Sequence, residues 1–253
     1  MKYNTLLAFR AHLAGELSPS TAITYYKAID FLLKDQPLLD CRNFDVHAVV
    51  IKLKAMKYKN QYSKYRNAFI KFCDYLNIEL SDKILLDLEL MKTEKIKKYR
   101  KLKPVNLKDI KNHIKVIRDK RLKLSFETML YSGLRVSELS QIRKEDCIVG
   151  KDTITLHFIG KGGKRETVII NDRRVVARLK NLIQSTRDEK KVFYTSSYLQ
   201  MKAHEKGFQC HDLRRAFAKL AYKEYKDISK VMELLRHSKI KTTKIYLRSK
   251  LKI

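Results

Sequence analysis

The sequence lacks the features that would place it in or on a membrane. It has no stretch of about 18 consecutive apolar residues, no signal-peptide pattern and no lipidation motif. It also lacks the GxxxxGK[ST] loop that binds nucleotide phosphates. We therefore expect neither a membrane partner nor P-loop chemistry.

Closely spaced cysteines are missing as well. The four cysteines, Cys41, Cys73, Cys147 and Cys210, are scattered, without the CxxC pairing of zinc sites and redox motifs. We interpret them as small buried apolar groups in a reduced, cytoplasmic protein. No metal ion or other cofactor is predicted.

Acidic residues are scarce relative to basic ones. The chain has 27 Asp plus Glu against 56 Lys plus Arg, a net charge of +29. Such a charge repels itself within a compact fold, and a polyanionic partner relieves that repulsion. Because membrane signals are missing, the predicted partner is nucleic acid.

Apolar spacing predicts a mainly α fold in two domains. Residues 1–93 show helical periodicity, with Ser18-Pro19 as a helix start, and indicate a helical bundle. Residues 104–253 are helix-rich but contain two β-type runs, 153–159 and 166–170, joined by a Gly162-Gly163 turn. The second domain is therefore predicted to be mixed α/β with a small antiparallel β-sheet.

A basic linker, residues 94–103, separates the two predicted domains. Such a run is often a solvated connector without a specific partner, and that alternative stays open. The charge of the whole chain favours phosphate contact instead. In the linker, the predicted DNA-binding residues are Lys97, Arg100, Lys101 and Lys103. The bundle adds Lys64 and Arg66, and the hairpin adds Lys164 and Arg165.

Two motifs in the second domain could bind phosphate. In the segment GLRVSEL, Arg135 and Glu138 are three residues apart and can share a helix face. In the hairpin segment GKGGKR, Lys161 ends the first strand. An ordinary surface ion pair and an exposed hairpin lysine are the alternatives, and each motif alone would favour them.

Two further motifs contain histidines. His211 and Arg214 form an HxxR pair whose side chains project together from the first turn of a predicted helix, and Arg with His suits a phosphoryl-transfer centre. His237 precedes Tyr246 by nine positions. Each feature alone could be a helix cap, a packed histidine or one of fourteen tyrosines.

The ordered set Arg135, Lys161, His211, Arg214, His237 and Tyr246 resembles the active-site series of the tyrosine recombinase (phage integrase) family. The segment Ser18-x-x-Thr21-x3-Tyr25 and the helix around residues 67–76 resemble the family's N-terminal core-binding bundle. The resemblance thus covers nearly the full chain, and it is to the simple two-domain members.

The resemblance implies a site-specific recombinase that cleaves and rejoins double-stranded DNA through a 3′-phosphotyrosine on Tyr246, without ATP or metal. It implies partner copies assembled on DNA as a tetrameric synapse. It also implies that Arg135 and Arg214 stabilise the charge on the phosphate and that Lys161 protonates the leaving oxygen. His211 and His237 would contact the phosphate and manage the tyrosine proton, and Glu138 would orient the site.

The sequence departs from the family pattern at two points. Arg236 stands where the family usually has glycine, and either a phosphate contact or tighter packing is expected. Seven residues follow Tyr246, so the sequence does not predict the C-terminal helix that docks on a neighbouring subunit in many relatives. A type IB topoisomerase-like enzyme and a non-catalytic DNA-binding factor are the alternative functions.

Overall fold

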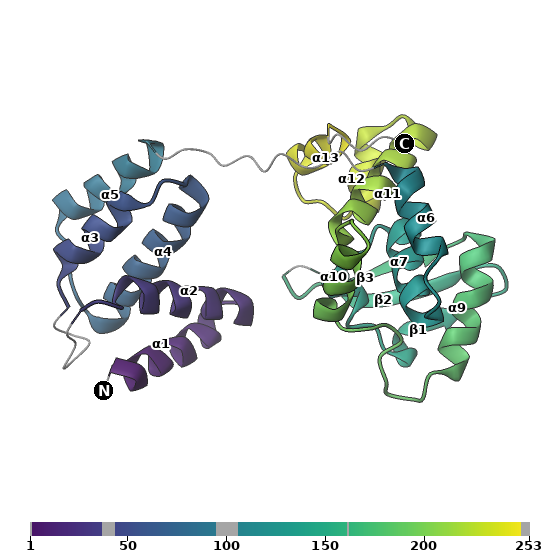
Figure 1. The fold of residues 1–253 in the computed structure, drawn as a ribbon, viewed down its shortest axis with the longest axis horizontal. Helices are drawn as coiled ribbons and strands as arrows, with labels where there is room; N and C mark the ends of the chain where they lie inside the picture. Colours follow the sequence, from purple (N-terminus) through teal and green to yellow (C-terminus); the bar gives the residue numbers. More distant parts are fainter. Residues whose placement is uncertain (1, 37–43, 95–105, 161, 249–253) are drawn as a thin grey trace. The chain divides into compact units, whose positions relative to one another are not determined.

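The computed structural model describes residues 2–36, 44–94, 106–160 and 162–248. Two compact units, residues 1–101 and 102–253, make up the chain (Figure 1). Several predicted residues lie outside the described residues, namely Cys41, Lys97, Arg100, Lys101, Lys103 and Lys161. No helix in the described ranges is both long and apolar enough to cross a membrane.

The first unit is the predicted helical bundle. Its helices are α1 (Lys2–Glu16), α2 (Pro19–Leu32), α3 (Val46–Ala55), α4 (Lys59–Leu76) and α5 (Asp82–Glu94). The Ser18 hydroxyl caps α2 by accepting from the Thr21 amide at 3.4 Å, with Pro19 in the first turn, as the sequence predicts. Phe9 and Phe72 pack edge to face in its core, with ring centroids 5.0 Å apart.

The second unit combines helices with one antiparallel sheet. Its strands, in sheet order, are β1 (Cys147–Val149), β2 (Ile154–Ile159) and β3 (Arg165–Ile170). Its helices are α6 (Leu107–Lys115), α7 (Lys120–Ser132), α8 (Val136–Leu139), α9 (Arg173–Ser185), α10 (Ser196–Glu205), α11 (Cys210–Tyr225), α12 (Ile228–Leu234) and α13 (Ile240–Leu247). The predicted mainly α fold with a β2–β3 hairpin is confirmed.

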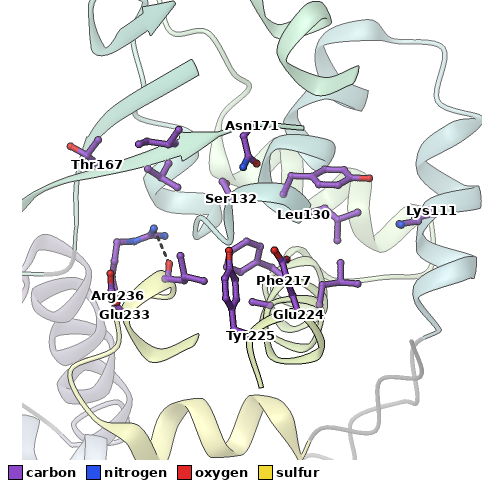
Figure 2. A pocket seen from close by; sticks show the side chains of 16 residues that line it. Lys111, Leu130, Ser132, Thr167, Asn171, Phe217, Glu224, Tyr225, Glu233 and Arg236 are labelled. Atoms are coloured by element: carbon purple, nitrogen blue, oxygen red, sulfur yellow. Dashed lines mark hydrogen bonds between the residues drawn. The ribbon is translucent and has the colours of Figure 1, made fainter. Parts of the chain in front are cut away.

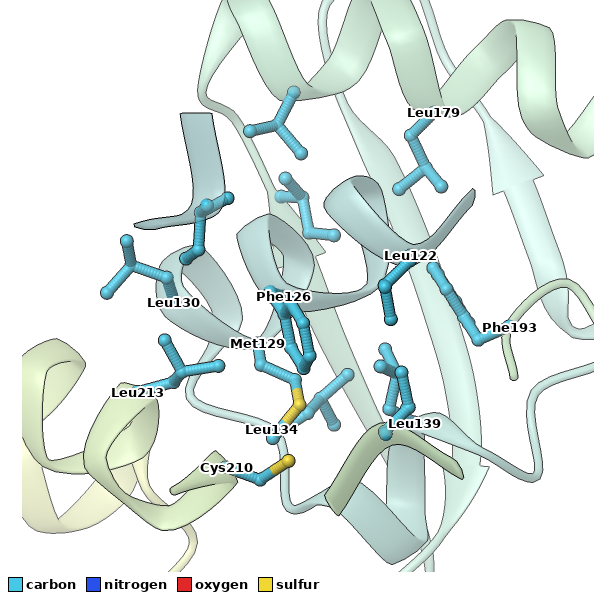
Figure 3. Packing of buried hydrophobic residues seen from close by; sticks show 14 of the residues in the cluster. Leu122, Phe126, Met129, Leu130, Leu134, Leu139, Leu179, Phe193, Cys210 and Leu213 are labelled. Carbon is cyan, nitrogen blue, oxygen red and sulfur yellow. The ribbon is translucent and has the colours of Figure 1, made fainter. Parts of the chain in front are cut away.

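Helix α7 lies at the centre of the second unit. Its residues Phe126, Met129 and Leu130 are at most 2% exposed. They belong to one apolar cluster with Leu179 of α9 and Leu213 of α11, which Figure 3 shows on different sides of α7. Since α7 ends at this core, the residues that follow it are held at a fixed position.

The second unit differs from the sequence prediction in its helices, its strands and one cysteine. The continuous helical pattern from His211 onward is divided into α11, α12 and α13, with left-handed residues Lys226 and Arg236 at the two breaks. Strand β1 and helix α10 are additional elements. Cys147 is only half-buried, which corrects the expectation that all four cysteines are buried, whereas Cys73 and Cys210 are buried free thiols.

Candidate active site

Arg135 is positioned by the turn that ends α7. Gly133 adopts the left-handed conformation (φ 66°), and a Cβ there would lie 2.5 Å from the Phe217 ring, so only glycine fits. The turn makes Arg135 the first residue before α8. Its amide donates to Glu138 Oε2 at 2.7 Å, and its guanidinium pairs with Glu138 Oε1.

Arg214 is the central side chain of the site and is fully buried. Its guanidinium donates to the carbonyls of Gly133 and Leu235, and its Nη1 lies 3.7 Å from Glu138 Oε2. It thereby connects the ends of α7 and α12. Burial, and secondarily Arg135, lower the pKa of Arg214 to about 10, so the guanidinium stays charged at neutral pH.

The two predicted histidines flank the ring of Tyr246. The ring centroids of His211 and His237 lie 5.0 and 4.9 Å from that of Tyr246, each at an interplanar angle of 85°. Burial is the main cause that lowers the pKa of both histidines to about 4, and Arg214 contributes in each case. Both imidazoles are therefore neutral at pH 7.

Thr243 orients His237 through a hydrogen bond and was not predicted from the sequence. The Thr243 hydroxyl is completely buried and lies 2.9 Å from His237 Nδ1, whereas His237 Nε2 is buried without a hydrogen-bond partner among the described residues. Thr243 and Tyr246 are three residues apart on α13 and share a face. That spacing is the signal that could have identified Thr243.

Tyr246 is itself buried, with 8% of its surface exposed. It packs in a small cluster with Ala218 and Ala221 of α11, Val231 of α12 and Leu235, the residue after α12. Helix α13 is held against α11 and α12 through this cluster. The phenol, both imidazoles and the Arg214 guanidinium therefore converge within one unit.

Arg236 packs beside this group rather than away from it. Its backbone is left-handed (φ 53°), the conformation that glycine adopts most readily. Its guanidinium lies over the Phe158 ring at 5.1 Å and forms an ion pair with Glu166, with Nε 3.3 Å from Oε2. The Arg236 side chain therefore packs against the β2–β3 hairpin.

A cavity of about 670 Å³ adjoins Arg236. Its lining includes Leu130, Phe217, Tyr225 and Arg236, as Figure 2 shows. Arg135, Arg214 and Tyr246 are not among the residues that line it.

Four of the predicted DNA-binding residues lie in the described parts of the chain, namely Lys64, Arg66, Lys164 and Arg165. Lys64 is exposed on α4, whereas Arg66 of the same helix is 15% exposed and pairs with Glu89 at 2.6 Å. Lys164 and Arg165 are exposed at the hairpin. In the described part of the chain, no three His, Cys, Asp or Glu side chains are grouped so as to hold a metal ion.

Curated relatives align with both parts of this chain. "Tyrosine recombinase XerA" of Pyrococcus furiosus is 27% identical over 264 residues, which is 97% of this chain and 83% of that protein. "Tyrosine recombinase XerH" of Campylobacter jejuni is 29% identical over 175 residues, covering 62% of this chain. That alignment spans 48% of the Campylobacter protein, so this chain matches only about half of its length.

Solved structures share the fold. A lambda integrase dimer bound to a COC′ core site superposes with a TM-score of 0.70 at 15% identity, over 98% of this chain and 77% of that one. XerH bound to difH substrate gives 0.59 at 18% identity, over 89% and 74%. The model of the phage integrase family matches residues 100–252. The chain therefore belongs to the phage integrase family of tyrosine recombinases.

Proposed function

We propose that this protein is a site-specific DNA recombinase that cleaves and rejoins strands through a covalent phosphotyrosine on Tyr246. One observation carries the proposal: Arg214, His211 and His237 converge on Tyr246, and Arg135 is tied to the same group through Glu138. A nucleophile, neutral bases and two fixed cations are the groups that phosphodiester transesterification needs.

The cleavage step conserves phosphodiester bonds. The Tyr246 oxygen attacks the scissile phosphorus, the bond to the 5′-oxygen breaks, and a 3′-phosphotyrosine and a free 5′-hydroxyl result. The phenol loses a proton and the leaving oxygen gains one. Rejoining reverses the step with a 5′-hydroxyl from another strand, so no external energy source is consumed.

Arg135 and Arg214 are suited to stabilise the phosphate as negative charge builds on its non-bridging oxygens. Glu138 holds both guanidiniums in fixed directions, so little reorganisation is needed during reaction. Arg214 is fully buried and Tyr246 almost so. We therefore propose that α13 shifts when DNA binds, so that a phosphate can reach both groups.

The neutral histidines are suited to accept the phenol proton and to contact the phosphate. Because both pKa values lie near 4, neither imidazole needs to lose a proton first at pH 7. Thr243 occupies Nδ1 of His237 and leaves Nε2 available. His237 can thus bond a phosphate oxygen or the phenol through Nε2.

Lys161 is proposed as the general acid for the leaving 5′-oxygen, from its place in the hairpin sequence. Lys64, Arg66, Lys164 and Arg165 and the basic linker are proposed to contact the DNA backbone, which would make binding fall steeply with salt. Solved relatives of the same fold include a lambda integrase tetramer bound to a Holliday junction. We propose a similar assembly of four copies on DNA in the cytoplasm.

A covalent-capture experiment tests this function. The full chain is incubated with a library of nicked duplexes whose central segment is randomised, and DNA that stays attached after denaturation is sequenced. We expect an adduct with the wild-type chain and with Tyr222→Phe, an exposed tyrosine of α11, but none with Tyr246→Phe. An adduct that persists in Tyr246→Phe would refute the assignment.

A second assay separates recombination from relaxation. Plasmids that carry two copies of the captured sequence should yield recombined circles. Relaxed plasmid without recombinants would indicate a topoisomerase-like enzyme, and DNA binding without any adduct would indicate a non-catalytic DNA-binding factor. Either result would overturn the proposed recombinase.

A further inference from the structure

Arg236 occupies a backbone position that disfavours any side chain. It follows α12 in the left-handed region (φ 53°), where residues with a Cβ are uncommon and persist only when their surroundings hold them. Its amide nevertheless closes the turn by donating to the Glu233 carbonyl at 2.8 Å. The contacts of the Arg236 side chain must therefore hold this backbone conformation.

The Arg236 guanidinium lies between two carboxylates that belong to different parts of the unit. On one side, Nη2 is 3.9 Å from Glu138 Oε2, the oxygen that also pairs with Arg214. On the other side, Nε is 3.3 Å from Glu166 Oε2 on β3. Nη1 donates to the Leu234 carbonyl at 3.1 Å, the bond drawn in Figure 2.

The β3 side of this contact belongs to the base of the β2–β3 hairpin. Glu166 pairs directly opposite Phe158, and the Arg236 guanidinium lies over the Phe158 ring. The Glu166 carboxylate also covers Gly160, where an added Cβ would lie 2.6 Å from Glu166 Cδ. Contacts therefore run from Arg236 through Glu166 to Gly160, the residue that follows β2.

We propose that Arg236 is a positioning residue that fixes the β2–β3 hairpin to Glu138, the carboxylate that orients Arg135 and Arg214. It acts through Glu166 and Phe158, and it has no proposed contact with the reacting atoms. The inference rests on the proposed function, because the hairpin sequence supplies the general acid. A small displacement of an acid from its target slows reaction strongly, so loose attachment of the hairpin should slow leaving-group departure.

A double-mutant cycle tests whether Arg236 acts through Glu166. The variants are Arg236→Met, which keeps an unbranched stem over Phe158, Glu166→Gln, and both together. Single-turnover cleavage of the captured DNA should slow about 10- to 100-fold in each single variant, and the double variant should be no slower than the slower single one. Multiplicative losses would overturn the proposal.

Controls keep this cycle interpretable. Arg178→Met removes a guanidinium that pairs with Glu127 at 2.9 Å elsewhere in the unit, and it should cleave at the wild-type rate. Thermal unfolding of every variant shows whether the fold survives. If Arg236→Met does not fold, Arg236→Lys replaces it in the cycle, because lysine retains the charge but loses the forked geometry.

A modified DNA identifies the step that Arg236 supports. Sulfur replaces the 5′-bridging oxygen at the cleaved phosphate, and a thiolate leaves without needing a proton. On this DNA, Arg236→Met and Lys161→Ala should both cleave within about 3-fold of wild type, because general-acid help is no longer needed. Equal slowing of Arg236→Met on both DNAs would indicate a phosphate contact or a general structural role, and would overturn the proposal.

Failure of the proposed function gives a different pattern. If Lys161→Ala is equally slow on both DNAs, the lysine is not the general acid. The double-mutant cycle would then still decide whether Arg236 acts through Glu166. If neither Arg236→Met nor Glu166→Gln changes cleavage of ordinary DNA, Arg236 only packs, and the positioning role is refuted.

Discussion

The two units of this chain bury different kinds of side chain. In the described parts of the chain, the polar and charged residues that are buried all lie in the second unit, and they are Ser125, Thr128, Ser132, Glu138, Ser140, Asp212, Arg214, His237 and Thr243. The core of the first unit is apolar, and its buried Tyr62 hydroxyl bonds the Leu88 carbonyl. Burial of charge opposes folding unless each group is paired. In the second unit the buried charges of Glu138 and Arg214 lie where fixed charges could act on a phosphate.

One pair of arginines shows the contrast directly. Arg66 in the first unit forms an ion pair with Glu89, whose side chain is 52% exposed. Arg214 in the second unit is fully buried and bonds two carbonyls while it pairs with Glu138. Arg66, whose side chain is 15% exposed, can be replaced at a lower cost in stability because its partner carboxylate is half exposed to solvent, whereas the fully buried Arg214 holds its neighbours in place.

The largest expected effect comes from Arg214→Met. It should destabilise the second unit by about 3–5 kcal/mol, because Glu138 and two buried carbonyls lose a partner, whereas Arg66→Met should cost the first unit about 1 kcal/mol or less. Amide hydrogen exchange read separately for peptides of each unit measures both losses. Equal losses in the two units would break the comparison.

Arg135→Ala should separate catalysis from stability. Arg135 is 29% exposed at its side chain, and Glu138 keeps Arg214 and Arg236 as partners. Cleavage of captured DNA should slow about 10²- to 10³-fold, while the free energy of unfolding changes by about 1 kcal/mol. A stability loss as large as that of Arg214→Met would contradict this distinction.

Acidification should weaken the second unit in particular. The pKa of His211 and His237 is lowered from 6.5 to about 4, so below pH 6.5 the unfolded chain binds protons that the folded chain does not. Their contribution to stability is complete above pH 6.5 and falls as pH drops toward 4. His237→Gln should make the free energy of unfolding depend less steeply on pH between 6.5 and 4, as measured by unfolding at several pH values. An unchanged slope would show that His237 does not titrate this way.

The smallest expected effect concerns the first unit. Tyr62→Phe removes the buried bond to the Leu88 carbonyl and should cost about 1 kcal/mol in urea unfolding. Cleavage by saturating enzyme should stay at the wild-type rate, since Tyr62 lies in the apolar bundle core. A loss of cleavage without loss of DNA binding would show that the two units are coupled in catalysis.

Local patterns explain which features were predictable. Ser18-Pro19 starts α2, Gly162-Gly163 turns the hairpin, and the HxxR pair lies at the start of α11, because each depends on neighbours in sequence. Strand β1 and helix α10 were not predicted. Thr243 was not predicted because its role depends on a hydrogen bond with His237, which lies before α13 and meets Thr243 only after folding.

By itself, the sequence determined the family, the mainly α fold, and the order of arginines, histidines and tyrosine, because these depend on residue type and short spacing. Only the tertiary structure decided that Glu138 pairs with Arg135, Arg214 and Arg236, and that both imidazoles flank Tyr246. These contacts join residues up to about a hundred positions apart. Burial and Coulomb energies depend on distance in space, which spacing along the chain does not specify.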